Sequence, residues 1–359
     1  MNDLDTTINE LLPKKKRIGS KLNFKHGRVD LSHGSGGRNT AQLIDQLFLS
    51  VFDNEWLAQN NDQACFTATT GRMVMSTDSY VISPLFFPGG DIGSLAVHGT
   101  VNDIAMAGAK PLYLSAGFIL EEGFPLSDLK KIVCSMARAA QQAGVAIITG
   151  DTKVVERGKG DGVFITTTGV GTLQDGILIS GDRARPGDRI IVSGYVGDHG
   201  VAIMSQRNNL QFFTSIQSDS AALHDLVAHM LSAAPHIHCL RDPTRGGVAT
   251  TLNEWARQSQ VGFMVNEKNI PIRTEVASAC ELLGLDPLYV ANEGKLLAIC
   301  PPDEAAALLA AMHTHPQGKE AADIGEVIED PRHFVQLRTK MGGLRMMDWL
   351  AGEQLPRIC

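Results

Sequence analysis

Short apolar runs alternate with segments of helical periodicity along most of the chain. Runs rich in β-branched and other apolar residues predict strands, because such side chains fit a pleated and buried surface. The predicted strands lie at residues 72–76, 112–120, 145–149, 164–170, 189–193, 262–265, 296–300 and 324–327. Strands and helices mix in both halves of the chain. This order favours an α/β (α+β) fold of two mixed domains over a single doubly wound sheet.

Apolar side chains three and four residues apart predict the intervening helices. The clearest example follows Ser127, the expected N-cap, and has Leu129, Ile132 and Met136 on one face before Gly144 ends it. Further predicted helices are the segment from Leu43 to Phe48, residues 91–109 with Asp91 as N-cap, and residues 248–258, 275–283 and 303–312.

Composition divides the chain into four parts. Residues 1–29 lack sustained periodicity, and we expect a flexible extension there. The segment 181–188 is polar and rich in Gly and Pro, so the two folded domains are predicted at 30–180 and 181–345. Residues 346–359 are predicted to be a mobile tail that ends in a cysteine.

Charge and cysteine content narrow the class of protein. The net charge is −7; residues 1–29 carry seven Lys/Arg and three Asp/Glu (+4), so the remainder carries −11. An acidic body argues against nucleic acid as the main partner, and Lys14–Arg17 is interpreted as a solvated arm. The six cysteines are scattered and no signal peptide is evident, which indicates free thiols in the cytoplasm. The longest apolar run, Ala305–Met312, is too short for a membrane span.

A glycine-rich turn precedes the first predicted helix. Gly34, Ser35, Gly36 and Gly37 could offer backbone N–H groups to phosphate, although many such loops are only turns. None of the Gly-Lys pairs in the chain is followed by Ser or Thr, which excludes a P-loop.

Four aspartates stand in polar breaks between apolar runs. They are Asp78, Asp103, Asp151 and Asp242. A single aspartate is usually a cap or turn residue. Four in Gly-, Thr- and Asn-rich contexts favour a Mg²⁺–nucleotide site, because carboxylates from separate segments hold this ion against phosphates.

Two long charged residues are candidates for the chemistry. Lys153 and Glu293 each lie beside Gly and small polar residues at the edge of an apolar run, where a lysine could meet phosphate or act as a base. The alternative is two ordinary surface residues. His199, in a Gly-Asp-His-Gly turn, is interpreted as structural, and His236 and His238 as surface or structural residues in preference to zinc ligands.

The chain ends in Leu-Pro-Arg-Ile-Cys. Pro356 favours an extended arm, and the twelve residues from Asp348 could reach roughly 40 Å if fully extended. A frayed tail is the simple explanation. The alternative is that Cys359 is a covalent carrier that moves between the active site and a partner.

Several stretches together resemble the HypE family of hydrogenase maturation factors, in the superfamily of aminoimidazole ribonucleotide synthetase and selenophosphate synthetase. The matching stretches are 33–38, 77–90, 99–108, 117–125, 150–158, 241–247, 280–295 and the terminal Pro-Arg-Ile-Cys, while residues 1–29 fall outside the match. The resemblance implies two domains of the aminoimidazole ribonucleotide synthetase-like fold, the first binding ATP and forming a homodimer. It also implies Asn102, Thr152 and Arg245 as nucleotide-binding residues beside the glycine loop.

The resemblance also implies an activity. A HypF-type carbamoyltransferase would load a carbamoyl group on Cys359, and ATP-dependent dehydration would convert it to S-cyanide. A HypC–HypD complex would then accept the cyanide for the iron of [NiFe] hydrogenase. Lys153 and Glu293 are the candidate bases, and the four aspartates the candidate Mg²⁺ ligands. Two alternatives stay open: another ATP-dependent synthetase of the superfamily, or a non-catalytic assembly scaffold.

Overall fold

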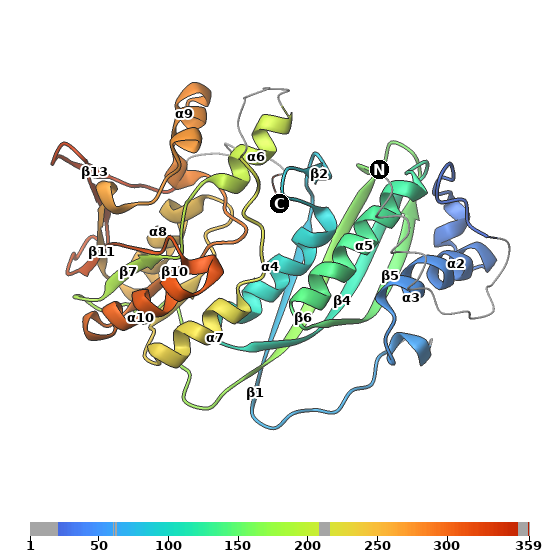
Figure 1. The fold of residues 1–359 in the computed structure, drawn as a ribbon, viewed down its shortest axis with the longest axis horizontal. Coiled ribbons are helices and arrows are strands. Elements are labelled where there is room, and N and C mark those ends of the chain that lie inside the picture. The colour runs from blue at the N-terminus through green and yellow to red at the C-terminus, as the bar shows by residue number, and fades with distance from the viewer. Residues whose placement is uncertain (1–20, 60, 62, 208–215, 351–357, 359) are drawn as a thin grey trace.

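Two separate β-sheets organise the computed structural model, which describes residues 21–59, 61, 63–207, 216–350 and 358. Among these residues, the first sheet has strand order β1-β6-β4-β5 and the second has β13-β12-β9-β11-β7-β10-β8. A small pair, β2-β3, stands apart from both. Figure 1 shows the first sheet and its helices on the right and the second domain on the left.

The first domain ends with β6, and its core already includes Val29, which is buried and donates its N–H to the Phe124 carbonyl, although residues 1–29 were expected outside the fold. Its helical elements are η1 (Leu31–Gly34), α2 (Arg38–Leu43), η2 (Ile44–Phe48), α3 (Leu49–Phe52), η3 (Leu57–Gln59), α4 (Ile92–Met106) and α5 (Leu126–Gln142). Its strands are β1 (Arg72–Tyr80), β2 (Phe86–Phe87), β3 (Gly90–Asp91), β4 (Lys110–Glu121), β5 (Ala146–Val155) and β6 (Val163–Leu173).

The second domain begins at β7, after the connecting residues 174–188. Its helical elements are α6 (Asp198–Arg207), α7 (His224–Ala233), α8 (Gly247–Ser259), η4 (Glu267–Asn269), α9 (Thr274–Leu283), η5 (Pro287–Tyr289), α10 (Pro302–Thr314) and η6 (Pro316–Gly318). Its strands are β7 (Arg189–Val192), β8 (Cys239–Arg241), β9 (Gly262–Asn266), β10 (Leu297–Cys300), β11 (Ala322–Ile328), β12 (Val335–Arg338) and β13 (Leu344–Met346).

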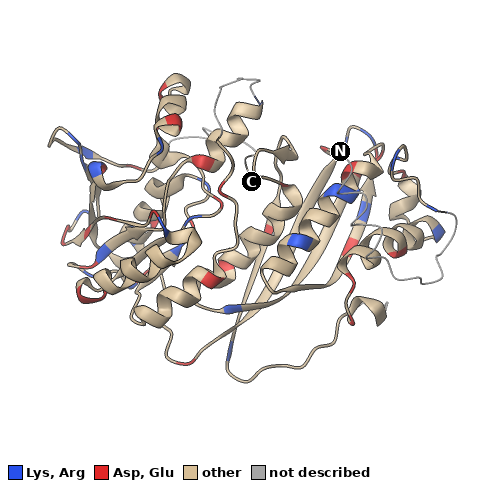
Figure 2. Ribbon diagram, in the orientation of Figure 1, with Lys and Arg blue, Asp and Glu red and all other residues tan. Residues whose placement is uncertain are grey.

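Helices α4 and α5 cover one face of the first sheet (Figure 1). The α5 apolar stripe is buried as predicted, and Lys and Arg lie on its outer side (Figure 2). Helix α4 packs so closely on β1 that a Cβ on Gly99 would lie 2.3 Å from the Tyr80 hydroxyl. Asp91 caps α4 as predicted, through the N–H groups of Gly93 and Ser94.

Along each strand of this sheet, side chains point in turn to the helix-covered face and to the opposite, open face. In β1, Tyr80 is buried under α4, whereas Met73 and Met75 point the other way, and Met75 is 71% exposed. Ile119 of β4 is exposed on the same open side. Exposed apolar side chains along a sheet face indicate a surface that packs against another protein.

Several local predictions differ from the structure. The N-cap of α5 is Pro125, and Ser127 lies inside the first turn, so that prediction is wrong. Strands β1 and β5 are longer than predicted, which places Asp78 and Asp151 inside strands instead of at their ends. Elements α6, α7, β8, β12 and β13 were not predicted from the sequence.

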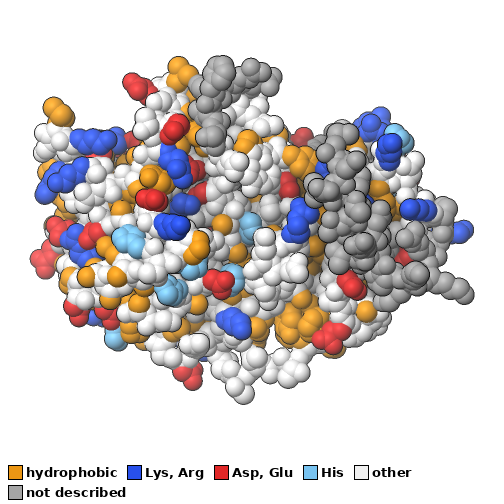
Figure 3. Space-filling model, viewed as in Figure 1, with side chains coloured by type: hydrophobic (Ala, Val, Ile, Leu, Met, Phe, Trp, Pro, Cys, Tyr) orange, Lys and Arg blue, Asp and Glu red, His pale blue; other side chains and the backbone are white. Residues whose placement is uncertain are grey.

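The two domains share apolar packing. One buried cluster combines Ala105 and Met106 of α4 with Leu226 and Met230 of α7. This packing fixes the end of α4 against the second domain and brings polar residues from both domains together. Figure 3 shows acidic, basic and histidine side chains interspersed on one face of the molecule. None of the described helices is both long enough and apolar enough to cross a membrane.

Candidate active site

Four carboxyl groups influence one another at the junction of the domains. Asp78 lies on β1, Asp103 on α4, Asp242 after β8, and Glu293 before β10. Burial raises the pKa of Asp242 to about 7, and the nearby Asp103 adds to the effect. Burial and then the charge of Asp242 raise the pKa of Glu293 well above its usual range. The pKa of Asp103 is also raised by burial, despite a 2.6 Å hydrogen bond from the Ser76 hydroxyl.

Crowded carboxyl groups without enough positive charge hold protons more tightly. Glu293 is 2% exposed, and its Oε1 has no hydrogen-bond partner among the described residues. A buried acceptor left without a partner is costly unless a ligand uses it. This cluster is therefore suited to receive a cation or a proton donor.

Asn102 and Asp219 hold Glu293 in place. The Asn102 amide donates to the carbonyls of Ala221 (3.0 Å) and Glu293 (3.4 Å), and its oxygen accepts from the Leu223 N–H at 2.8 Å. The Glu293 N–H donates to Asp219 Oδ1 at 3.0 Å. The Asn102 side chain thus fixes the chain around Glu293, and its contact with nucleotide stays a prediction.

The glycine loop and Lys153 lie at the other edge of the first sheet. Gly34 packs on β5, where an added Cβ would lie 2.5 Å from the backbone nitrogen of Val154. Lys153 forms an ion pair with Asp151 at 2.6 Å, and its side chain is 63% exposed. Thr152, between them, is buried on the helix-covered side.

The strand register shows how the predicted set divides. Ser79 of β1, Thr166 of β6, Gly117 of β4 and Asp151 of β5 form one row across the sheet. Three strand spacings separate the ends of this row, which is about 14 Å. Alternation along the strands also puts Asp78 on the helix-covered face and Asp151 on the open face.

The sequence-predicted site residues therefore form two groups within one chain. One contains Asp78, Asp103, Asp242 and Glu293, with Asn102 directly behind them. The other contains residues 34–37 and 151–153. Arg245 is exposed in the loop between β8 and α8, on the side of the first group.

The donors in the first group suit magnesium. Oxygen donors are those Mg²⁺ prefers, and the ion usually takes only one or two carboxylates together with substrate phosphates and water. No group of three His, Cys, Asp or Glu residues within the described ranges is arranged to hold a metal alone. The aspartates therefore remain predicted Mg²⁺ ligands.

The end of the described chain lies beside this group. Ile358 is 2% exposed and belongs to the apolar cluster that includes Ile203 and Ala291. Its carbonyl accepts a 2.8 Å hydrogen bond from His199 Nε2. In Figure 1 the chain end lies near β2 and α6. Cys359, the next residue in the sequence, lies outside the described residues.

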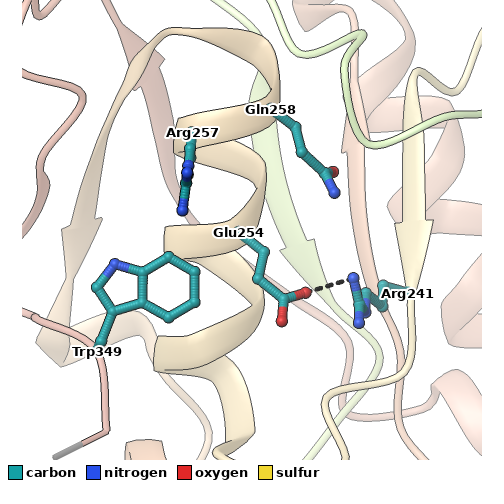
Figure 4. A pocket seen from close by; sticks show the side chains of 5 residues that line it. All are labelled: Arg241, Glu254, Arg257, Gln258 and Trp349. Atoms are coloured by element: carbon teal, nitrogen blue, oxygen red, sulfur yellow. Dashed lines mark ion pairs between the residues drawn. The ribbon is translucent and has the colours of Figure 1, made fainter.

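A separate hollow lies along α8. Its lining residues are Arg241, Glu254, Arg257, Gln258 and Trp349 (Figure 4). Arg241 pairs with Glu254 there. The histidines near β8 also have protein partners: His236 contacts Glu304, and His238 contacts Asp188 at 2.7 Å.

Comparison with known proteins first gives the class. Residues 60–173 match the family model of the AIR synthase related protein, N-terminal domain. Residues 185–338 match the model of the corresponding C-terminal domain. The chain thus has the two-domain AIR synthase architecture that the sequence predicted.

Similarity to individual proteins identifies the family within this class. Carbamoyl dehydratase HypE of Cupriavidus necator is 69% identical over 339 residues, which cover 94% of this chain and 97% of the relative. A solved structure of hydrogenase maturation protein HypE in complex with ATP is 53% identical, with a TM-score of 0.88 and coverage of 92% and 99%. A solved HypE–HypF complex is 49% identical, with a TM-score of 0.76 and coverage of 86% and 99%. This chain belongs to the HypE family of carbamoyl dehydratases.

Three residues of the junction escaped sequence reasoning as functional candidates. Asp219 and Lys295 form a buried ion pair at 3.3 Å beside Glu293, and His199 contacts Ile358. Only His199 had a local signal, its position in a Gly-Asp-His-Gly turn after a strand. Lys295 ends the matching stretch 280–295 but was given no role, and Asp219 carries no motif, because its role depends on which segments the two domains bring together.

Proposed function

We propose that this chain uses ATP to dehydrate a carbamoyl group carried on the thiol of Cys359. The product is the S-cyanide from which the cyanide ligands of [NiFe] hydrogenase iron are made. Membership of the carbamoyl dehydratase HypE family gives the reaction class. The observation that carries the rest is the burial of Ile358, the neighbour of Cys359, at the junction that holds Glu293 and the aspartates.

The chemistry needs activation of a poor leaving group. The carbamoyl oxygen attacks the γ-phosphorus of ATP and ADP leaves, so that oxygen now belongs to a phosphate ester. The C–O bond then breaks and inorganic phosphate departs, while the nitrogen gives up both protons and becomes a nitrile. The atoms balance as S-carboxamide and ATP to S-cyanide, ADP and phosphate.

Glu293 is the first candidate for the proton acceptor. Its buried Oε1 has no hydrogen-bond partner in the part of the chain that the structure describes, and a raised pKa makes the ionised form a stronger base. Lys153 is the second candidate. Its ammonium group can also stabilise the phosphate, because phosphoryl transfer depends mostly on placed positive charge.

Asp78, Asp103 and Asp242 are the residues that we expect to hold Mg²⁺, with Asp151 as a fourth. The ion would neutralise charge on the phosphates during transfer. Asp103 and Asp242 have raised pKa values, so they gain most from a cation. Residues 34–37, Asn102, Thr152 and Arg245 remain the predicted contacts to ATP.

A homodimer would complete the site. Asp151 and Lys153 point to the open face of the first sheet, whereas Asp78 and Glu293 lie on the other side of it. Met73, Met75 and Ile119 are exposed on this open face, with the hydroxyl pairs Thr77–Thr168 and Ser79–Thr166 between them, and the face as a whole is suited to a second copy of the same sheet. If two copies pack there with the β5 edge of one sheet beside the β1 edge of the other, the glycine loop and Lys153 of one chain would approach the carboxylates of its partner around that edge.

The partners follow from the reaction. A HypF-type carbamoyltransferase supplies the carbamoyl group, supported by the solved HypE–HypF complex. A HypC–HypD complex is the proposed cyanide acceptor. We also propose the cytoplasm as location, where thiols stay reduced, since the five described cysteines are all free.

Intact-mass measurement tests the proposal. The chain is incubated with a HypF-type carbamoyltransferase and its carbamoyl donor, and ATP is then added. The expected result is a carbamoyl adduct on the last residue that loses one water only when ATP is present. An adduct that persists with ATP, or one that maps to another cysteine such as the exposed Cys65, would contradict the proposal.

A further inference from the structure

We propose that His199 is the positioning residue that holds the end of the chain in the active site. Its Nε2–H donates to the carbonyl of Ile358, the residue that precedes the carrier cysteine in the sequence. This inference rests on the proposed function, because it concerns how the carrier thiol is held. The sequence pattern had indicated only a turn residue at this position.

Three residues from other parts of the chain contact the His199 imidazole: Ile358, Phe87 and Ser218. His199 lies in α6 and has no exposed surface, and its Nε2 lies 2.8 Å from the Ile358 oxygen. The edge of the Phe87 ring in β2 meets the imidazole at a centroid distance of 5.6 Å and an interplanar angle of 87°. The Ser218 hydroxyl lies 2.8 Å from Nδ1. A ring held on three sides can point a donor in only one direction.

The hydrogen bonds define which nitrogen carries the proton. The Ile358 carbonyl can only accept, so Nε2 must be the donor. The Ser218 oxygen already accepts from the Ser220 N–H at 3.1 Å, which leaves its own proton for Nδ1. The neutral tautomer with a proton on Nε2 therefore satisfies all three groups, and burial lowers the His199 pKa in agreement.

The same segment connects the imidazole to the reacting group. Ser218 contacts His199, and the next residue, Asp219, accepts the backbone N–H of Glu293. The Ser218 N–H in turn donates to the Pro88 carbonyl of the first domain at 2.7 Å. The position of the Ile358 carbonyl is thus set relative to Glu293 through a short series of fixed contacts.

The Ile358 side chain provides a second contact that is independent of the hydrogen bond to His199. It is buried among apolar residues, while the carbonyl points to His199. Removal of either the His199 hydrogen bond or the apolar packing of Ile358 should release the end of the chain without changing the carboxylates. This gives two variants that test one proposal by different physical routes.

The experiment measures alkylation of Cys359 in the full-length chain by peptide mass, with the exposed Cys65 as internal reference. His199→Leu keeps an apolar group of similar size but has no donor, and loss of one buried hydrogen bond should raise Cys359 labelling about fivefold. Ile358→Ala should raise it by roughly thirtyfold or more. Single-turnover loss of water from the carbamoylated chain should also slow, more in Ile358→Ala than in His199→Leu, with ATP affinity unchanged.

Two controls separate positioning from a purely structural role. His199→Gln can still donate from its amide nitrogen and should restore most of the protection and the rate. His98→Leu removes a matched histidine, whose Nδ1 contacts Ser220 at 2.9 Å and not the tail, and should change neither.

Unchanged labelling in both His199→Leu and Ile358→Ala would overturn the proposal, as would His199→Gln behaving like His199→Leu. Labelling of Cys359 needs no catalysis, so it tests the positioning role of His199 separately from the proposed dehydratase function. A wild-type chain that protects Cys359 but never loses water would refute the proposed function and leave the positioning intact.

Discussion

Binding of Mg²⁺ and ATP should release protons from the carboxylate cluster, and Asp242 sets the size of the effect. Burial and the neighbouring Asp103 raise the Asp242 pKa to about 7, so close to half of these side chains are protonated at neutral pH. A carboxylate must ionise before it can hold the cation. The free protein therefore has to lose this proton when the ligand binds.

The magnitude follows from the titration of one group. With a pKa near 7, the ionised fraction of Asp242 falls from about nine-tenths at pH 8 to about one-tenth at pH 6. Affinity for Mg²⁺–ATP should fall about tenfold over that range, which corresponds to roughly 1.4 kcal/mol. Near neutral pH, about half a proton should leave Asp242 for each nucleotide bound.

Isothermal titration calorimetry in two buffers of different ionisation enthalpy measures the released protons. Asp242→Asn keeps the shape of the side chain and removes its titration. The difference between the two proteins also cancels the protons that ATP itself exchanges. Equal proton release in both, or an affinity for Mg²⁺–ATP that does not fall between pH 8 and pH 6, would refute the assignment of Asp242 to the cation.

Four further outcomes are expected. Asp242→Asn should also raise the melting temperature of the unliganded protein at pH 8 by roughly 2 °C or more, because the folded pKa lies above the unfolded value and ionisation above it costs stability; a lower melting temperature in a thermal scan would contradict this. Glu293→Gln should keep ATP binding but slow single-turnover dehydration by about a hundredfold or more, and a rate within threefold of wild type would remove Glu293 as the base. Cys359→Ala should bind ATP normally and form no nitrile, and cyanide transfer by this variant would disprove the carrier role. Mixing inactive Lys153→Ala and Glu293→Gln chains should recover about a quarter of wild-type activity if sites combine two subunits, whereas no recovery after verified subunit exchange would mean that each site is built from one chain.

Local patterns determined much of the fold. The apolar stripe of α5, the Asp91 cap of α4 and the breaks around residues 181–188 depend on side chains near one another in sequence, so they could be predicted. Elements with weak periodicity were missed, α6 and α7 among them. Candidate chemistry was also visible, because Gly-, Asp- and Lys-containing segments stood out from their apolar surroundings.

Only the tertiary structure decided how these candidates are grouped. Strand order depends on pairing between distant segments, and it places β1 and β5 at opposite edges of one sheet. Strand alternation then turns Asp78 and Asp151 to opposite faces, although both looked alike in sequence. His199 and Ile358 are 159 positions apart, and no local rule joins them. Their contact exists because packing of two domains encloses a space in which a buried donor and a buried carbonyl must satisfy each other.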